Sequence, residues 1–205
     1  GLVAVNRGSI QMCRVTGFTI SGSEKIGGLV GINDGGLISS SSAWLSISGT
    51  SHIGGLAGVN HGTIRHSGSY AQISGSSNLG GLVGSSHEAS IIRECASLGY
   101  ASGTVSVGGL VGSAFGATIE NCCSTTSVEG DDSTQAGGLV GIIGGQSLVK
   151  NCYSAGLVAA ADSNSTRSGG LIGSNTGCFV LDSYWDKETS GKLGSGGGEG
   201  KTTAE

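Results

Sequence analysis

Residues Gly27–Gly31 read GGLVG, and near-copies of this pentapeptide return along the whole chain of 205 residues. The leucine of the motif recurs every 26 to 32 residues, at Leu2, Leu29, Leu56, Leu82, Leu110, Leu139 and Leu171. Repeats at a nearly fixed period of this size are typical of solenoids, propellers and helical arrays. The repeat therefore decides the fold class more firmly than any single motif.

Each repeat unit reads as short strands joined by glycine turns. No unit holds a long helical pattern, and the 42 glycines would penalise a helix at every turn. Two or three strands per unit are fewer than a propeller blade needs. We predict an all-β, parallel β-solenoid (β-helix) of about seven coils of 26–32 residues. We expect it to be right-handed, as parallel crossovers are. The solenoid occupies residues 1–182, and residues 183–205 form a C-terminal cap and glycine-rich tail.

Stacked coils should bury columns of equivalent residues. The motif leucines form one column, and their glycine neighbours allow close approach of the backbone. A second column is predicted at Ile10, Ile38, Ile64, Ile92, Ile119, Val149 and Val180. A third is predicted at Ile20, Ile47, Ile73, Val105, Val128 and Val158. The turn after the motif repeats Asn-x-Gly, so we expect an asparagine ladder at Asn6, Asn33 and Asn60.

Composition argues against several functional classes. The formal net charge is −4 and the basic residues are scattered, so nucleic-acid binding has little support. Glycine interrupts every aliphatic run, so we expect no membrane insertion.

The segment GSGGGEGKTT at Gly194–Thr203 resembles a phosphate-binding loop, but Ser195 stands where that motif needs its first glycine. We therefore expect a flexible tail or linker, no nucleotide and no cofactor.

Four cysteines share one repeat position, three residues after the second column, where the other coils have serine. They are Cys13, Cys95, Cys122 and Cys152. The first interpretation is a buried column of small thiols that serine can replace. The alternative is one disulfide among Cys95, Cys122, Cys123 and Cys152, since adjacent coils fall within disulfide range.

No residue set points to metal binding or catalysis. His61 and His87 share a turn position on adjacent coils, with Asp34 one coil earlier, and we interpret them as solvated turn residues. Asp131 and Asp132 are the only adjacent acidic pair, whereas glycosidase chemistry needs two carboxylates at a defined separation. We therefore predict no catalytic residue, no metal ligand and no enzyme activity.

Strand alternation should place a row of hydroxyl groups on one flat outer face. The tripeptides TIS, SIS, QIS and TVS flank the third column. The candidate ligand-binding residues on this face are Thr19, Ser21, Ser46, Ser48, Ser74, Thr104 and Ser106. The alternatives are an ordinary polar strand surface, or a face that binds carbohydrate or ice.

These motifs resemble a known repeat family. GGLVG, then Asn-x-Gly, then the steps at Ile119–Cys122 and Val149–Ser154 are similar to the GLUG-motif repeat. That repeat occurs in bacterial surface proteins of the filamentous-haemagglutinin-like adhesin type. The segment at Asp182–Gly191 is similar to one that often closes such arrays. The resemblance covers nearly the whole chain and implies an extracellular β-solenoid that serves as a stalk or display module. It implies no catalytic residue.

The leading functional hypothesis is a non-enzymatic structural segment of a bacterial extracellular or cell-surface protein. The chain begins directly at a repeat motif. We expect either a segment cut from a longer solenoid or an end, formed by Leu2, Val3 and Val5, that receives another copy head to tail. The expected partners are therefore another copy, a neighbouring solenoid or a carbohydrate.

Overall fold

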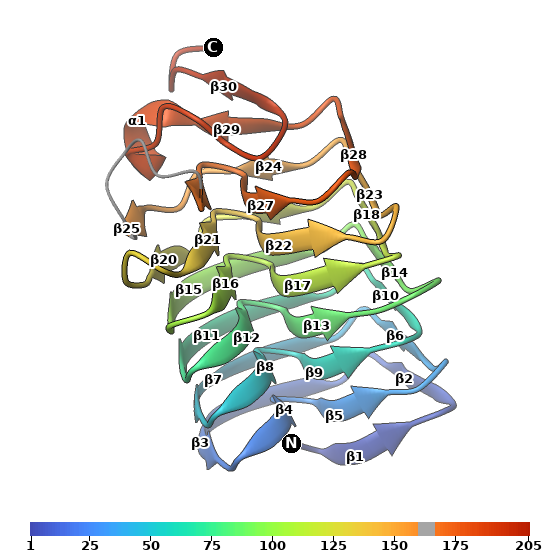
Figure 1. Ribbon diagram of the computed structural model, residues 1–205. Coiled ribbons are helices and arrows are strands. Elements are labelled where there is room, and N and C mark those ends of the chain that lie inside the picture. The colour runs from blue at the N-terminus through green and yellow to red at the C-terminus, as the bar shows by residue number, and fades with distance from the viewer. Residues whose placement is uncertain (160–166) are drawn as a thin grey trace.

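The computed structural model describes residues 1–159 and 167–205, with the Phe18 side chain left out. The chain winds into a parallel β-solenoid of about six full turns (Figure 1). In Figure 1 the chain crosses the front from left to right, returns behind and rises toward the C-terminus, which is the right-handed sense. The predicted all-β class and solenoid architecture are confirmed. The seventh coil is partial, with described strands in only three of the four sheets.

Four sheets, here named A to D in the order in which each coil visits them, form the walls. Sheet A contains β1 (Val3–Asn6), β5 (Val30–Asn33), β9 (Ala57–Asn60), β13 (Val83–Ser86), β17 (Val111–Phe115), β22 (Val140–Gly144) and β27 (Ile172–Asn175). Sheet B contains β2 (Ser9–Gln11), β6 (Leu37–Ser39), β10 (Thr63–Arg65), β14 (Ile91–Arg93), β18 (Thr118–Glu120), β23 (Leu148–Lys150) and β28 (Phe179–Leu181). Every pairing in both sheets is parallel, between adjacent coils.

Sheets C and D complete each turn. Sheet C contains β3 (Arg14–Ser21), β7 (Ser42–Ser48), β11 (Gly68–Ser74), β15 (Ala96–Ser102), β19 (Cys123–Ser124), β20 (Ser127–Glu129), β24 (Tyr153–Ser154), β25 (Val158–Ala159), β29 (Tyr184–Asp186) and β30 (Glu199–Lys201). Sheet D contains β4 (Glu24–Gly27), β8 (Ser51–Gly54), β12 (Ser77–Gly80), β16 (Ser106–Gly108), β21 (Gln135–Gly137) and β26 (Ser168–Gly169). One short helix, α1 (Lys187–Ser190), follows β29.

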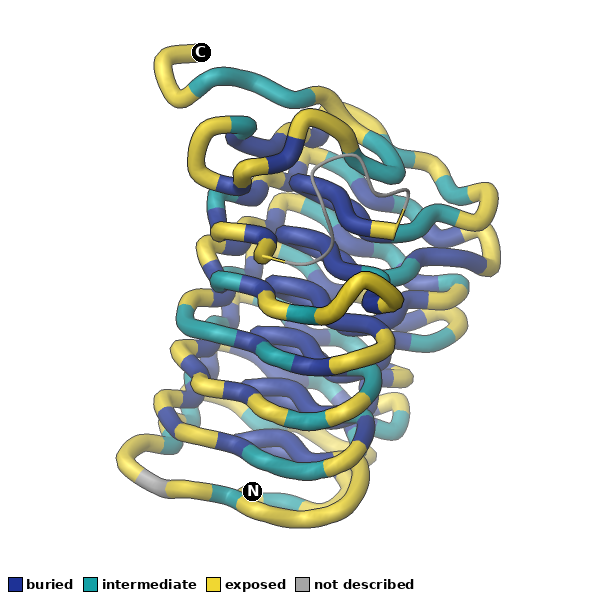
Figure 2. Tube along the Cα trace, turned by 60° about the vertical axis from the view of Figure 1, so that its left-hand side comes forward, coloured by how far each residue is buried: buried dark blue, intermediate teal, exposed yellow. Residues whose placement is uncertain are grey.

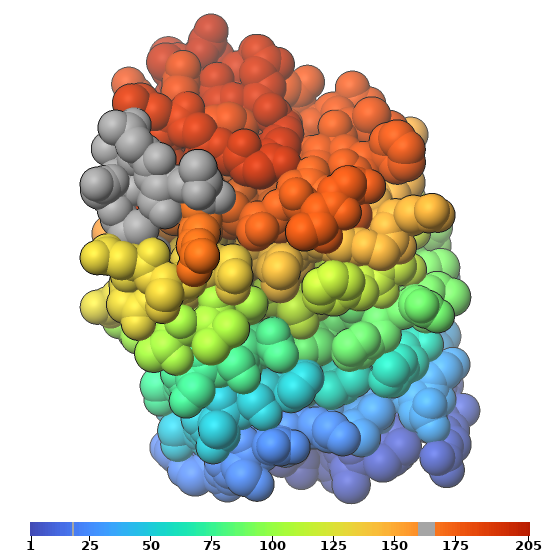
Figure 3. Space-filling model, viewed as in Figure 1, coloured from blue at the N-terminus to red at the C-terminus, as the bar shows by residue number. Residues whose placement is uncertain are grey.

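The core consists of columns of equivalent side chains, as predicted. The six motif leucines from Leu29 to Leu171 are fully buried, whereas Leu2 at the open end is 62% exposed. The second column follows the sheet B register, and its five central members are fully buried. Figure 2 shows the same pattern, with buried walls in the middle coils and an exposed first coil. Figure 3 shows each coil as its own band, so sequence order is also height along the axis.

The predicted third column is wrong at one coil. Ile73 pairs in register with Ala101, which is fully buried, whereas Val105 is 48% exposed. The column therefore runs through Ile20, Ile47, Ile73, Ala101, Val128 and Val158. Val105 precedes β16 and belongs to the corner between sheets C and D.

Two further columns contribute to the core. One lies next to the motif leucine in sheet A and contains Val30, Ala57, Val83, Val111, Val140 and Ile172. The other lies in sheet D and contains Ile26, Ile53, Leu79, Val107 and Ala136. The three predicted columns therefore account for only part of the aliphatic core.

The motif glycines are required by close backbone packing. A Cβ on Gly54 would lie 2.1 Å from the Ala57 carbonyl oxygen. A Cβ on Gly55 would lie 2.3 Å from the Gly81 carbonyl oxygen of the next coil. Neither glycine has a positive φ. Glycine therefore recurs in the motif because the corner between sheets D and A leaves no room for a side chain.

The two described ends of the solenoid differ. At the N-terminal end, the core opens into a hollow of about 390 Å³ whose lining includes Leu2, Val15 and Ile20. At the C-terminal end, the residues after β28 fold back over the last coil. The Ser195 hydroxyl accepts a hydrogen bond from the Ile172 N–H (2.8 Å), and β30 pairs with β29. The expected flexible tail is therefore wrong, because part of it forms a strand.

Candidate functional site

The asparagine ladder is a structural feature of the corner between sheets A and B. The Asn6 amide donates to Asn33 Oδ1, and the Asn33 amide donates to Asn60 Oδ1, both at 2.8 Å. Asn60 continues the ladder to the Ser86 hydroxyl at 3.3 Å. Asn33 and Asn60 are fully buried. Their side chains are engaged in bonds between coils, so the ladder itself has a structural role.

The cysteine column, defined as Cys95, Cys122 and Cys152, is buried at the corner between sheets B and C. Each thiol donates to the carbonyl two residues earlier, at 3.2 Å. Ser67 and Ser183 make the equivalent hydroxyl bond in their own coils. Serine and cysteine therefore make the same hydrogen bond to the backbone at this position, as the first interpretation proposed.

All six cysteines are free thiols in the structure. The Cys122 thiol beside it, together with burial, raises the pKa of Cys152 far above the usual range for cysteine. Burial also raises the pKa of the outward-facing Cys123. A protonated thiol is neither a nucleophile nor a good metal ligand. Cys95 differs, because its hydrogen bond with the Cys122 thiol lowers its pKa. All three thiols are buried and bonded to the backbone, so the cysteine column has a packing role.

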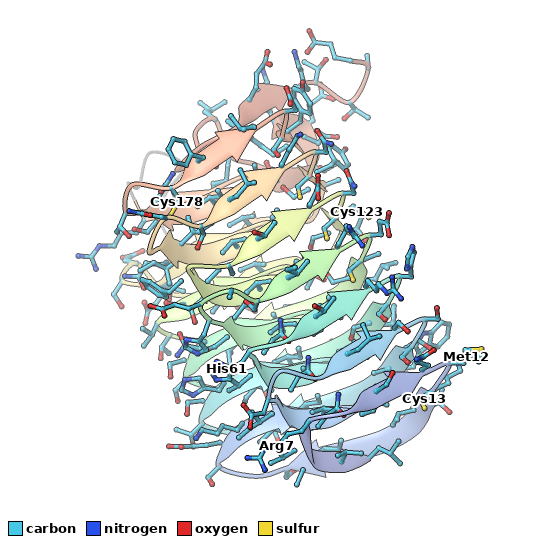
Figure 4. The ribbon with its side chains drawn as sticks, turned by 90° about the vertical axis from the view of Figure 1, so that its right-hand side faces the viewer. Arg7, Met12, Cys13, His61, Cys123 and Cys178 are labelled. Atoms are coloured by element: carbon cyan, nitrogen blue, oxygen red, sulfur yellow. The ribbon has the colours of Figure 1, made fainter. Side chains whose placement is uncertain are left out.

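His61 and His87 lie at a different corner from the cysteine column. In Figure 4, His61 and Arg7 lie at one edge of sheet B, while Cys13 and Cys123 lie at the other. His61 and His87 stack with their ring centroids 4.9 Å apart, and Asp34 is paired with Arg7 instead. Burial lowers the pKa of His87. Among the described residues, no group of three His, Cys, Asp or Glu side chains could hold a metal ion.

The adjacent acids form a turn. Asp131 Oδ1 accepts hydrogen bonds from the Ser133 hydroxyl (2.6 Å), the Ser133 N–H and the Thr134 hydroxyl. These bonds hold the pKa of Asp131 below its usual value. An aspartate that caps its own loop in this way is a turn residue.

Five of the seven predicted hydroxyl-face residues lie together on the outside of sheet C. Ser46 pairs in register with Thr19 and Gln72, and Ser48 pairs with Ser21 and Ser74. The Ser21 and Ser48 hydroxyl groups are 3.0 Å apart.

The other two predicted residues lie elsewhere, so their assignment to this face is wrong. Ser106 is buried in sheet D and donates to Gln135, while Thr104 bonds the Ser76 carbonyl at the preceding corner. The residues in register on this coil are Tyr100 and Ser102. Counting nine residues from the second column would have found them, since Ile64 and Ile73 have the same separation as Ile92 and Ala101.

Residues 103–129 match the family model described as the GLUG motif. The chain carries a GLUG motif. The matched segment runs from the end of sheet C through β16, β17, β18 and β20, so it corresponds to one complete coil. The same positions recur on the other coils, which is consistent with a GLUG-motif repeat protein. No curated protein matches the chain.

The sequence reasoning missed an exposed apolar column on the GLUG solenoid. Trp44, Tyr70 and Leu98 lie in register on the outside of sheet C, and each is about half exposed. Their common signal is a bulky residue three positions before each member of the third column, namely Ile47, Ile73 and Ala101. We call these three residues the aromatic column.

The predicted assembly residues lie at the open end of the GLUG solenoid. Leu2 and Val5 are exposed, and Val3 is half-buried against the core. Val3 and Val5 pair with β5 on one side only. Among the described residues, no helix is long and apolar enough to cross a membrane.

Proposed function

We propose that this GLUG solenoid is a non-enzymatic structural segment of a bacterial extracellular or cell-surface protein, in which it serves as a stalk. The observation that supports this role is the continuous pairing of strands from coil to coil. Backbone pairing runs through seven strands in sheet A and seven in sheet B. In a solenoid each coil contacts its neighbours, so an unbroken stack of this kind forms a stiff spacer.

The use of the polar side chains supports a structural role over a catalytic one. The buried asparagines bond between coils, the buried thiols bond to the backbone, and Asp131 closes its own turn. Groups engaged in this way are not positioned to transfer protons or to attack a substrate.

The cap favours a stalk over a fibre built from identical copies. A head-to-tail fibre would place the open β1 edge of one copy on the C-terminal face of another. On that face, the Ser195 and Gly196 backbone and side-chain groups already bond to Ile172, and Trp185 is buried beneath Gly200. The capped C-terminal face is therefore poorly suited to receive the open edge of another copy.

Native-state hydrogen exchange of the full chain tests the structural proposal. The amides of sheets A and B in the middle coils should be the most protected, because each is held between two neighbouring coils. Rapid exchange throughout these coils would contradict a stiff stalk.

Negative-stain electron microscopy over a concentration series separates the stalk from the fibre. We expect isolated particles at every concentration. Filaments with a repeat near ~34 Å, the height of seven stacked coils, would establish the fibre instead. Such filaments should disappear in Val5→Glu, which places a charge on the open edge.

A further inference from the structure

The aromatic column leaves apolar surface in water on three consecutive coils. Trp44 is 51% exposed, Tyr70 is 47% exposed and Leu98 is 46% exposed. Single exposed apolar residues are ordinary, but a contiguous stripe marks a surface that binds something. Packing of the solenoid does not explain this stripe, since the side chains of the inner face already fill the core.

The rings of this stripe are ordered before any ligand arrives. The Trp44 and Tyr70 ring centroids lie 5.6 Å apart with a tilt of 43°. The Arg14 guanidinium carbon lies 5.0 Å from the Trp44 ring centroid, within the range of a cation–π contact. Aromatic side chains held in this way lose little conformational entropy when a partner binds.

A shallow groove runs beside the aromatic column. It has a volume of about 250 Å³, its exposed lining is mostly apolar, and it includes Ile47 and Ile73. Its walls are formed by Thr19, Ser46, Ser48, Gln72, Ser74 and Tyr100. The surface therefore offers aromatic rings on one side and hydroxyl and amide groups on the other.

We propose that this surface binds a neutral, extended polysaccharide that lies along the solenoid axis. Sugar rings present C–H groups that pack against aromatic faces, and their hydroxyl groups exchange hydrogen bonds with serine hydroxyls and a glutamine amide. β7 and β11 contain no charged residue, and the Arg14 guanidinium beside them already contacts the Trp44 ring, so the surface favours a neutral chain over an acidic one. The ladder repeats at the spacing of adjacent strands, so a linear polymer can follow it.

This inference goes beyond the structural role and does not depend on it. A stalk with this face would hold a glycan along its length, and the face would bind equally well if the chain assembled into fibres. The hydroxyl row alone would also suit ice, but the Trp44, Tyr70 and Gln72 side chains interrupt a flat hydroxyl plane.

Affinity electrophoresis of the full chain tests the proposal, with hydroxyethyl cellulose and a soluble β-glucan as neutral probes and polygalacturonate as the acidic probe. We expect retardation by at least one neutral probe and none by the acidic one. Trp44→Ala and Tyr70→Ala should each weaken retardation about tenfold, the loss typical of an anchoring aromatic residue. Tyr153→Ala is the matched control, because Tyr153 is 41% exposed in β24 of the same sheet but outside the column.

Tryptophan fluorescence gives a readout that does not require a destabilising variant. Trp44 is exposed and Trp185 is buried, so acrylamide quenches mainly Trp44. The neutral polysaccharide that retards the chain should protect this emission from quenching. The proposal fails if no neutral probe retards the chain, if Tyr153→Ala weakens binding as much as Trp44→Ala does, or if Trp44 stays fully quenched. Inhibition of ice growth without sugar retention would assign the face to ice instead.

Discussion

One corner of every coil contains a residue in left-handed backbone conformation. The corner lies between sheets B and C, and the seven φ values range from 46° to 54° at Met12, Ser40, His66, Glu94, Asn121, Asn151 and Asp182. Asn and Asp adopt this conformation with little strain, whereas it costs other residues with a Cβ conformational energy. The left-handed residue turns the chain at this corner. The next residue then occupies the buried serine and cysteine position.

Replacing Ser40 tests the cost of that conformation. Ser40 is exposed with φ 49°. We expect Ser40→Asn to raise the free energy of unfolding by about 0.5 kcal/mol and Ser40→Val to lower it by about 1–2 kcal/mol. Denaturant unfolding measures both changes. The matched control is Ser46, exposed on an extended strand, where the Val variant should be neutral or stabilising. Equal effects of Val at both positions would contradict the argument.

At the scale of the strand, the sequence predicted the columns wherever the repeat length is constant. Nine residues separate the second and third columns in most coils, and Ile38 with Ile47 is one such pair. Coil one has ten residues in this interval, and β3 absorbs the extra residue in a bulge between Thr16 and Thr19, where Gly17 has φ 78°. Val105 has a β-branched side chain in a Thr-x-Ser context, which predicts a core position. The register, which only the strand pairing fixes, places the smaller Ala101 in the core instead.

The candidate surface was only half predictable for the same reason. The hydroxyl residues repeat as visible tripeptides, whereas Trp44, Tyr70 and Leu98 share no residue type. A column of unlike side chains becomes apparent only when the strands are aligned. Ring contacts between coils, such as that of Trp44 with Tyr70, follow from that register.

The cysteine column predicts which substitutions its corner accepts. Cys122→Ser should change the free energy of unfolding by less than about 1 kcal/mol, because the hydroxyl can donate to the same Glu120 carbonyl. Cys122→Leu should destabilise by about 1–3 kcal/mol through overpacking between Cys95 and Cys152. Thermal unfolding measures both variants. After incubation under oxidising conditions, thiol labelling of the denatured protein should still count six thiols, and a lower count would show that a disulfide forms.

Two histidines make the solenoid sensitive to mild acid. Burial is the main cause that lowers the pKa of His52 and of His87 in the folded state below the unfolded value of 6.5. The unfolded chain therefore binds protons first as the pH falls, so stability is full above pH 6.5 and declines until the folded pKa is passed. The combined variant His52→Gln, His87→Gln should flatten this decline in denaturant unfolding. A variant whose profile runs parallel to the parent profile would contradict this cause.

Across the whole molecule, stability is a sum over neighbouring coils, so the ends matter most. The two ends differ in how their strand edges are treated. β1 leaves one edge unpaired, while the last coil is closed by residues 194–201. Natural β-proteins cover such edges because an unpaired edge recruits other strands. The C-terminal segment is therefore expected to keep the chain monomeric as well as stable.

Removal of residues 194–205 tests the cap. The truncation removes the Ser195 hydroxyl from the Ile172 N–H and the β30 strand from β29, and it uncovers Trp185, which is 5% exposed in the intact chain. We expect concentration-dependent association in light scattering, a red shift of Trp185 emission, and faster hydrogen exchange confined to the last coils. Trp44→Ala is the control, since it removes an exposed tryptophan without touching an edge. A truncated chain that remained monomeric with unchanged Trp185 emission would show that the partial seventh coil closes the solenoid by itself.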